Sequence, residues 1–294
     1  MTDEMTSTPG KTSESEAKYR SSWSLPGSAE RNSEAIAQAL ASMLESAAIG
    51  SGSREGKKGR KHRPTILEVA SGFGHQICAV AASPEGSKCR FQPTEADRYL
   101  CDQIDARAAS SSVSASTISK GEGDEQSQDK SRSKTSNVRK AELLDLLDQN
   151  DWLALAHNVS AELDLGDEDG EGCGIFDGVL VCNLTHVAPW SVTESLFSHL
   201  DPRLSYMTNQ GTRSLLDPKT GWIAIYGAFN QHGRFTSEGN QKFDHDIRSR
   251  NPEFGLRDIQ AQLEPLAHRH GYQLHQQIEM PAGNLLLVFR VRDQ

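Results

Sequence analysis

The sequence predicts a doubly wound α/β fold built on a mostly parallel sheet of seven strands. Predicted strands and helices alternate through five or six rounds, and the clearest strands are continuous apolar runs. Continuous apolar strands are typical of a parallel sheet, whose two faces are both covered by helices. A predicted pair of strands closes the chain, which adds a terminal antiparallel strand to this sheet.

The first half of the chain supplies three of the predicted strands. An amphipathic helix is expected over 28–48, because its apolar residues recur at a spacing of 3.6 residues. We then expect strands and helices in alternation: a strand at 65–70, a helix from 76 to 82, a strand from 88 ending at Pro93, a helix over 98–109, a helix over 137–157 and a third strand at 158–165.

The second half contains the strand with the clearest signal, the apolar run Phe176–Cys182. A helix over 192–200 and an irregular insertion over 201–220 are expected to follow it. The remaining predicted elements are a buried strand at 221–229, a helix over 256–271 and two strands joined at Pro281–Gly283.

Residues 28–294 are expected to form a single domain that follows a polar tail and contains two polar segments. Residues 1–27 are rich in Ser and Thr and predicted to be a disordered tail, and 110–136 is predicted to be a disordered insertion. Residues 51–64 are predicted to be a basic, glycine-rich linker. Hydrophobic residues make up only 36% of the chain, which agrees with segments outside the core.

Composition and charge exclude several classes of function. A net charge of −9 argues against general nucleic-acid binding, and no apolar run approaches the roughly 18 residues of a membrane span. The N-terminus lacks the apolar region of a secretory signal, so a cytoplasmic protein is predicted. The basic run 57–63 leaves a nuclear-localisation signal as an alternative. The five cysteines form no C-x-x-C pair, and no metal site is predicted. The oligomeric state stays open.

The segment LEVASGFGHQ, Leu67–Gln76, joins the first predicted strand to its helix and carries two glycines one residue apart. In open α/β sheets a ligand lies beyond the carboxyl ends of the strands, and glycines let it approach the backbone closely. The dinucleotide fingerprint G-x-G-x-x-G has a third glycine where this chain has Ile77, which disfavours NAD. S-adenosylmethionine (SAM) has no pyrophosphate and fits better. Its predicted loop contacts are Ala70, Ser71, Gly72, Phe73 and Gly74; an ordinary tight turn is the alternative.

Further polar residues at strand ends are candidate cofactor ligands. Glu68 lies within an apolar strand, where a buried carboxylate needs a partner such as the ammonium group of a ligand. Glu95 follows Gly74 by 21 residues, the spacing of an acid that binds a ribose diol, and Asp97 is the alternative. Asp164 is expected to accept a hydrogen bond from the adenine amino group, and Asn183 to hold the methionine moiety.

Seven blocks resemble one small methyltransferase family, typified by the human methyltransferase-like protein twenty-six and including bacterial members long assigned to a domain of unknown function. The blocks are AERN at 29–32, LEVASGFGHQ at 67–76, FQPTEAD at 91–97, NLTHVAPW at 183–190, YGAF at 226–229, FDHDIRSRNPEFGLRD at 243–258 and MPAGN at 280–284. The resemblance implies a class I Rossmann-like fold that uses SAM. The chain departs from the family pattern where His75 and Gln76 are exchanged, where Glu95 replaces Asp, and at Gly283.

The predicted acceptor side of the site comes from the second half of the chain. His186 is the candidate general base and Tyr226 the candidate lining of the methyl-transfer pocket; each has a purely structural alternative. A polar stretch and the last turn provide further candidate acceptor ligands, for which a solvated helix face is the alternative: Asn240, Asp244, Arg248, Arg250, Arg257 and Asn284.

The sequence therefore favours a SAM-dependent methyltransferase that acts on an unidentified acceptor, either a small molecule or a protein. A catalytically inactive protein of the same fold, which binds SAM in a regulatory role, is the first alternative. An NAD(P)-dependent oxidoreductase is the second, and Ile77 at the third glycine position argues against it.

Overall fold

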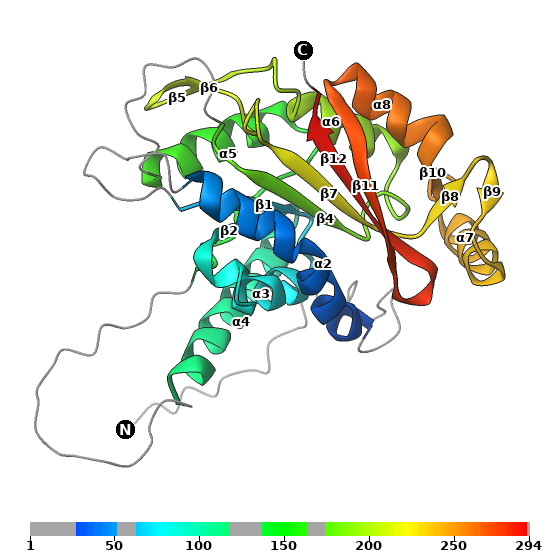
Figure 1. Cartoon of the computed structure of the whole chain (residues 1–294), viewed down its shortest axis with the longest axis horizontal. Coiled ribbons are helices and arrows are strands. Elements are labelled where there is room, and N and C mark those ends of the chain that lie inside the picture. Colours follow the sequence, from blue (N-terminus) through cyan, green and yellow to red (C-terminus); the bar gives the residue numbers. More distant parts are fainter. Residues whose placement is uncertain (1–27, 52–62, 118–136, 164–173, 293–294) are drawn as a thin grey trace, which may run out of the picture.

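A computed structural model describes residues 28–51, 63–117, 137–163 and 174–292, and its centre is a seven-stranded sheet (Figure 1). The strand order is β11-β12-β7-β4-β1-β2-β3. All strands run parallel except β12, which is antiparallel to both of its neighbours. The strands are β1 (Thr65–Val69), β2 (Arg90–Glu95), β3 (Glu142–Leu143), β4 (Gly178–Cys182), β7 (Trp222–Gly227), β11 (Tyr272–Met280) and β12 (Asn284–Val291).

This topology confirms the predicted doubly wound, mostly parallel sheet with a terminal antiparallel strand. From β1 the chain first builds outward through β2 to β3 and then returns to place β4 on the other side of β1. The strand order therefore reverses between β1 and β4, and such a switch point is where open α/β sheets bind ligands. The last strand lies between β7 and β11, inside the sheet.

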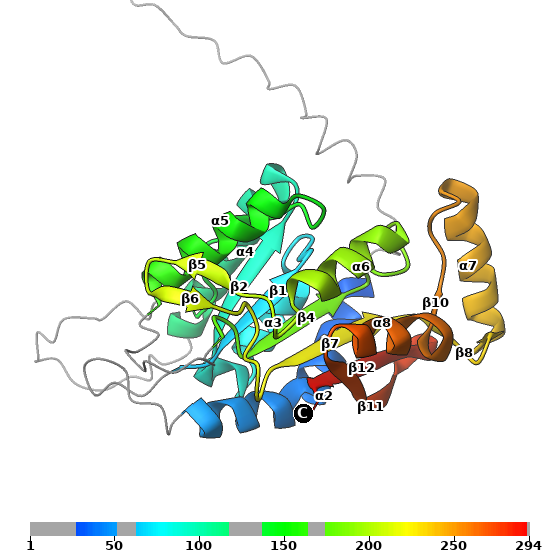
Figure 2. The ribbon, with the colours of Figure 1, turned by 90° about the horizontal axis from the view of Figure 1, so that it is seen from above.

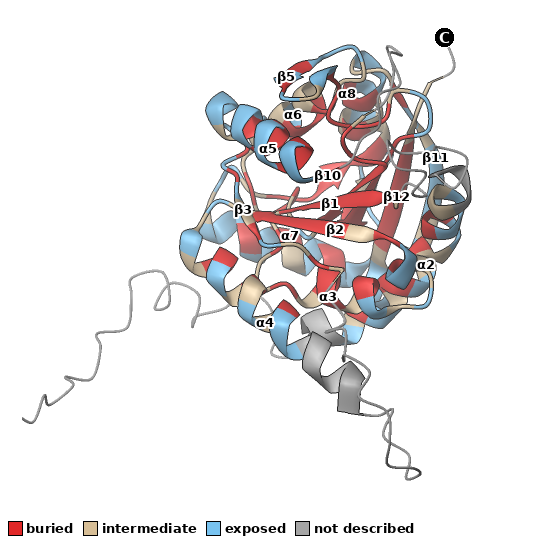
Figure 3. Cartoon of the chain, turned by 90° about the vertical axis from the view of Figure 1, so that its left-hand side faces the viewer, coloured by how far each residue is buried: buried red, intermediate tan, exposed pale blue. Residues whose placement is uncertain are grey.

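Helices cover both faces of the sheet, as Figures 2 and 3 show. One face is covered by α2 (Ser28–Ser51), α3 (His75–Ala82) and α4 (Arg98–Thr117). The other is covered by α5 (Gln149–Glu162), α6 (Trp190–His199) and α8 (Glu264–Arg269). The buried strands lie between helices that are buried only on their inner sides, the arrangement that continuous apolar strands predict.

Alternate strand residues supply two separate cores. Leu67 and Val69 of β1 pack with α5, α6 and α8, whereas Ile66 packs with α2 and α3. On β7, Ile225 belongs to the first of these cores and Tyr226 to the second. The sheet is thus apolar on both faces, which makes any polar side chain within it an exception that requires an explanation.

Two predictions about the first half of the chain were wrong. Residues 158–162 of the predicted third strand form the end of α5, and 164–165 lie outside the described residues. The third strand of the sheet is the two-residue β3, inside a segment that was predicted to be helical. β3 pairs with the end of β2, so tertiary pairing overrides the helical pattern there. Residues 110–117, predicted to be disordered, complete α4. The tail 1–27, linker residues 52–62 and residues 118–136 lie outside the described residues.

The segments after β4 contain two smaller sheets. The predicted irregular insertion 201–220 holds a hairpin of β5 (Tyr206–Thr208) and β6 (Gly211–Arg213). A three-stranded sheet joins β10 (Arg257–Asp258), β8 (Phe229–Gln231) and β9 (Arg234–Phe235). Helix α7 (Glu238–Arg250) lies between β9 and β10 in the chain and stands to one side of the helix layers (Figure 2). Within the described ranges, no helix has the length and apolar character needed to cross a membrane.

Candidate functional site

The glycine loop lies at the carboxyl end of β1, beside the switch point of the sheet. Ala70, Gly72 and Gly74 all have positive φ angles, of 54°, 58° and 74°. An alanine in this region is uncommon, and such backbone outliers concentrate at ligand sites. A Cβ atom added at Gly72 would meet no heavy atom within 4 Å, so the loop is open on that side. Gly74 caps α3 without a side-chain hydrogen bond, which leaves the helix N-terminus to interact with a ligand.

Glu95, the last residue of β2, bonds directly to the glycine loop. Its Oε1 accepts the backbone N–H of Gly72 at 2.9 Å, and its Oε2 accepts that of Ala96 at 2.8 Å. A carboxylate offers about four acceptor positions, so it can bind several donors at once. Asp97, the alternative acid, instead accepts the N–H of Tyr99 at the start of α4. The structure therefore brings Glu95, not Asp97, to the glycine loop.

Glu68 is a buried acid within the sheet. Its side chain is only 1% exposed, and neither carboxylate oxygen has a hydrogen-bond partner among the described residues. Burial raises the pKa of Glu68 to about 8; the neighbouring Ser71 side chain opposes this shift, and the charge of Glu95 adds a smaller increase. A buried acid without a partner is costly for a stable core, so this residue is expected to serve a ligand.

The carboxyl ends of β4 and β7 form the adjoining part of the site. Asn183 follows β4, has a φ angle of 54°, and donates its backbone N–H to the carbonyl of Tyr226 at 2.8 Å. Strands β1 and β4 are neighbours, and each is thus followed by a left-handed residue that is not glycine. The segments after β1 and β4 therefore both leave the sheet through a strained residue at the switch point.

His186, the candidate base, is buried beside the end of β7. It is 3% exposed, and its ring is so close to Gly227 that a Cβ atom there would lie 3.1 Å from Nδ1. Nδ1 has no hydrogen-bond partner among the described residues, and the ring packs edge-on against Phe243. Burial, assisted by the charge of Arg257, lowers the pKa of His186 to about 4, so the imidazole is neutral at pH 7.

Tyr226, Asn284 and Asn240 are connected through the hairpin that joins the last two strands. The amide of Asn284 donates to the Tyr226 hydroxyl at 3.0 Å, and that of Asn240 donates to the carbonyl of Gly283 at 3.0 Å. Burial raises the pKa of Tyr226 to about 12, so the phenol is protonated at neutral pH. The structure thus brings these three predicted residues together.

Asp244 and Arg248, two other candidate acceptor ligands, bind one another and the loop beyond α7. The Arg248 Nε donates to Asp244 Oδ2 at 2.7 Å, while Asp244 Oδ1 accepts the N–H of Leu256. Arg257 lies behind the loop after β4 and donates to the carbonyls of Thr185 and Ala188. These charged groups hold protein segments in place. Asp244 is buried, so it does not lie on the solvated helix face that the sequence left as the alternative.

The corrected position of β3 changes the candidate for the adenine contact. Asp164 lies outside the described residues, in a gap that follows α5 rather than a strand. Asp145 is the acid that follows β3, one residue after Leu144, whose N–H binds the carbonyl of Glu95. An acid just after a short apolar stretch is a sequence signal for this position, but the helical pattern around it concealed the strand. Arg107 of α4 was also missed, although it contacts the glycine loop.

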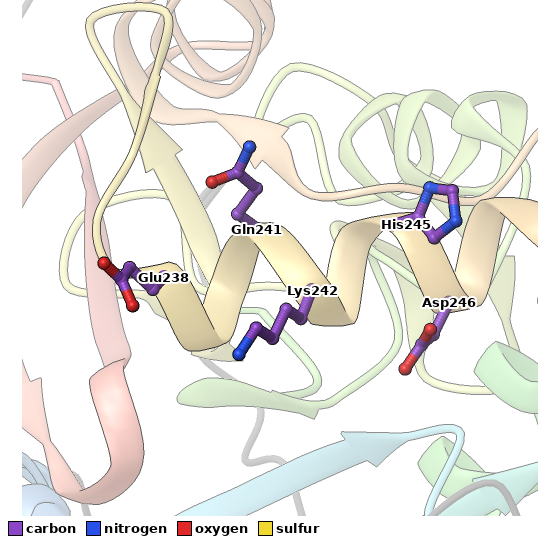
Figure 4. Close-up of a pocket in the computed structure, with 5 residues that line it drawn as sticks. All are labelled: Glu238, Gln241, Lys242, His245 and Asp246. Carbon is purple, nitrogen blue, oxygen red and sulfur yellow. The ribbon is translucent and has the colours of Figure 1, made fainter.

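A surface hollow of about 430 Å³ lies elsewhere, along the exposed side of α7. Its lining consists of Glu238, Gln241, Lys242, His245 and Asp246, all of which extend from this one helix (Figure 4). None belongs to a loop at the carboxyl edge of the sheet. The hollow therefore adds nothing to the candidate site. No cluster of potential metal ligands occurs among the residues described by the structure.

Comparison with known proteins gives one family and several structural neighbours. A family model described as "Protein of unknown function (DUF938)" matches residues 24–291. An O-methyltransferase family protein from Burkholderia thailandensis has 12% identity and a TM-score of 0.52; the match covers 90% of this chain and 60% of that protein. A second crystal structure, named LaPhzM, has 11% identity and a TM-score of 0.50, with coverages of 94% and 61%. The chain therefore spans less than two thirds of these neighbours, and the likeness establishes the fold.

Proposed function

We propose that this chain, which belongs to the protein family of unknown function DUF938, is a methyltransferase that uses SAM. The observation that carries the proposal is the glycine loop. It is open at Gly72, bonded to the carboxylate of Glu95, and lies beside a buried Glu68 whose carboxylate has no hydrogen-bond partner in the described part of the chain. The same-fold O-methyltransferase family protein supplies a precedent for methyl transfer on this sheet.

The residues at this edge fit the chemical groups of SAM. Glu95 would accept from the ribose hydroxyls, and Glu68 would take the ammonium group of the methionine moiety. Residues Ala70–Gly74 would lie beneath the cofactor, with Asn183 at the methionine moiety. Asp145 replaces Asp164 as our proposed partner for the adenine amino group, since it follows β3 at the same edge.

When bound, SAM supplies a methyl group already activated on a sulfonium sulfur, so the protein mainly has to align the acceptor and exclude water. Tyr226 and Asn284 are proposed to orient the acceptor, because their hydrogen bond fixes the phenol at the end of β7. His186 is neutral, and a pKa near 4 makes it a weak proton acceptor. Its proposed role is therefore a hydrogen bond through Nδ1 rather than strong base catalysis.

The finer assignments are also proposals. The blocks of similarity support membership of the methyltransferase-like protein twenty-six group, with a small molecule or a protein as the acceptor. A cytoplasmic location is proposed, and the basic run 57–63, of which 57–62 lie outside the described residues, keeps a nuclear location as the alternative. Asn240, Asp244 and Arg248 remain candidate acceptor ligands. The last two would have to exchange their present partners for an acceptor.

A regulatory protein that binds SAM without turnover is the second candidate. Two observations favour it: the weakly basic His186, and the mutual satisfaction of Asp244 and Arg248. Incubation with methyl-labelled SAM and fractionated cell extract separates the two candidates. Label transfer that is lost in the Gly72→Val variant supports the enzyme, whereas binding without transfer to any fraction supports the regulatory protein.

A further inference from the structure

Arg107, on the third turn of α4, reaches the glycine loop from a part of the chain 34 residues away. Its Nε donates to the backbone carbonyl of Phe73 at 2.7 Å, and its Nη2 lies 3.0 Å from Nε2 of His75. One partly buried guanidinium therefore contacts the residues on both sides of Gly74. These bonds are charge-assisted on the donor side, which places them among the stronger hydrogen bonds of proteins.

The bond to Phe73 fixes the plane of one peptide unit. The N–H of Gly74 donates to the carbonyl of Ser71 at 2.9 Å, while the carbonyl of the same unit accepts from Arg107. The peptide between Phe73 and Gly74 is thus held at both ends. Because this peptide links the open Gly72 to the first residue of α3, its orientation sets the direction of the N–H groups that face a ligand.

Helix α4 also supports the loop through an apolar contact. A Cβ atom added at Gly74 would lie 3.3 Å from the side chain of Ile104, which precedes Arg107 by three residues. Residues three apart lie on the same side of a helix. Ile104 and Arg107 therefore form one surface of α4. The loop residues 73–75 contact this surface.

The contact with His75 also assigns the state of that side chain. A guanidinium has only donors, so Nε2 of His75 must accept the bond and its proton must reside on Nδ1. A glutamine at this position has a carbonyl oxygen that can accept the same bond, whereas a leucine has none. This difference gives a conservative and a disruptive variant at one site.

We propose that Arg107 is a positioning residue for the cofactor: it holds the glycine loop of residues 72–75 in the shape that binds SAM. The inference rests on the proposed function, because it assumes that this loop receives the cofactor. Without the hydrogen bonds of Arg107, the loop would occupy the binding-competent shape for a smaller fraction of the time. The apparent affinity for SAM falls in proportion to that fraction. The hydrogen bonds involved correspond to a loss of roughly 10- to 100-fold.

The test is calorimetric titration of S-adenosylhomocysteine (SAH) into the full chain and two matched variants. Arg107→Met keeps the apolar stem and removes the bonds to Phe73 and His75. Arg139→Met is the control, since Arg139 is also partly buried and bonds to Gln92 and Glu162, away from the loop. We expect Arg107→Met to weaken SAH binding by at least about tenfold and Arg139→Met by less than about twofold. Equal affinities for the two variants would overturn the inference, whatever their thermal stabilities.

A comparison of two substitutions at His75 separates a positioning role of Arg107 from general destabilisation of the protein. We expect His75→Gln to retain SAH affinity within about twofold, and His75→Leu to lose at least about threefold. In the Arg107→Met background the difference between the two His75 substitutions should shrink, because the bond between Arg107 and His75 is gone. If His75→Leu binds SAH as tightly as His75→Gln in the parent chain, the hydrogen bond between Arg107 and His75 has no role in binding.

The two proposals fail in different ways. If the parent chain does not bind SAH, the proposed function fails before any variant is compared. If the parent chain binds SAH and Arg107→Met binds it equally well, the methyltransferase proposal stands and only the role of Arg107 is refuted.

Discussion

The two halves of the carboxyl edge differ in how their polar groups are satisfied. Over β1 and β2, the backbone turns through three left-handed residues, the loop is open at Gly72, and Glu68 is buried without a partner among the described residues. Beside β4, β7 and α7, polar side chains bind one another or backbone carbonyls: Asp244 with Arg248, Asn284 with Tyr226, and Arg257 with Thr185.

This difference explains why the structure constrains the cofactor more closely than the acceptor. The first half presents polar groups and backbone in a costly state that a ligand would relieve. The polar groups named in the second half already have partners in the protein, with the buried Nδ1 of His186 as an exception, so an acceptor must fit beside existing contacts or replace them. Substitutions in the first half should therefore change cofactor affinity, and those in the second should change stability.

The largest effect is expected from Gly72→Val. A β-branched residue at a φ angle of 58° is strained by roughly 1–3 kcal/mol, and its side chain would occupy the open side of the loop. We expect SAH affinity to fall by at least about 100-fold in a calorimetric titration. Gly233→Val is the matched control, since Gly233 also has a positive φ angle and open surroundings, but lies in the turn between β8 and β9. Similar losses of affinity in both variants would contradict a cofactor site at Gly72.

Glu95→Ala should have the next largest effect. This substitution removes the acceptor for Gly72 and Ala96 together with the proposed ribose contact, so a loss of about 30-fold in SAH affinity is expected. Asp97→Ala removes only the bond to the N–H of Tyr99 and should leave the affinity within about threefold. The reverse ranking would assign the ribose to Asp97.

Glu68 makes a prediction about pH. Its pKa is about 8 in the folded protein against 4.5 ordinarily, so between these values the folded chain holds a proton that the unfolded chain has released. Its contribution to stability is full below about pH 4.5 and is lost as the pH rises towards 8. The unfolding free energy of the parent chain should therefore fall relative to that of Glu68→Gln as the pH rises from about 5 to 8. Urea denaturation of both proteins across this range measures the difference. A constant difference over that range would show that Glu68 is ionised in the folded protein.

The smallest effect on binding is expected from Asp244→Ala. This variant leaves the buried N–H of Leu256 without its partner, which costs roughly 1–3 kcal/mol of unfolding free energy. Arg248→Met should cost less than about 1 kcal/mol, because the arginine side chain is 47% exposed. Both variants should bind SAH within about twofold of the parent chain. A large loss of SAH affinity with unchanged stability would extend the cofactor site to α7.

Strong local patterns made most of the fold predictable. Continuous apolar runs identified β1, β4 and β7, and the closing pair of strands identified β11 and β12. The third strand was missed, because β3 has only two residues and is stabilised by pairing with β2 rather than by its own pattern. That error displaced the adenine candidate to Asp164, whereas Asp145 follows the actual strand.

The site was predictable where it depends on spacing along the chain and unpredictable where it depends on packing. Glu95 was found from its distance to Gly74, and the structure bonds it to Gly72. The burial that lowers the pKa of His186 leaves no mark in the sequence. Nor does a local pattern show that Arg107 reaches back to Phe73, because only the packing of α4 against the loop brings them together.

The most direct test of the central claim is calorimetric titration of SAM and, separately, NAD into the parent chain. The account predicts that one SAM binds per chain with a dissociation constant below about 1 mM, and that NAD gives no binding heat over the same range. Binding of NAD without SAM, or of neither, would contradict the assignment of the glycine loop and Glu95 to a SAM site.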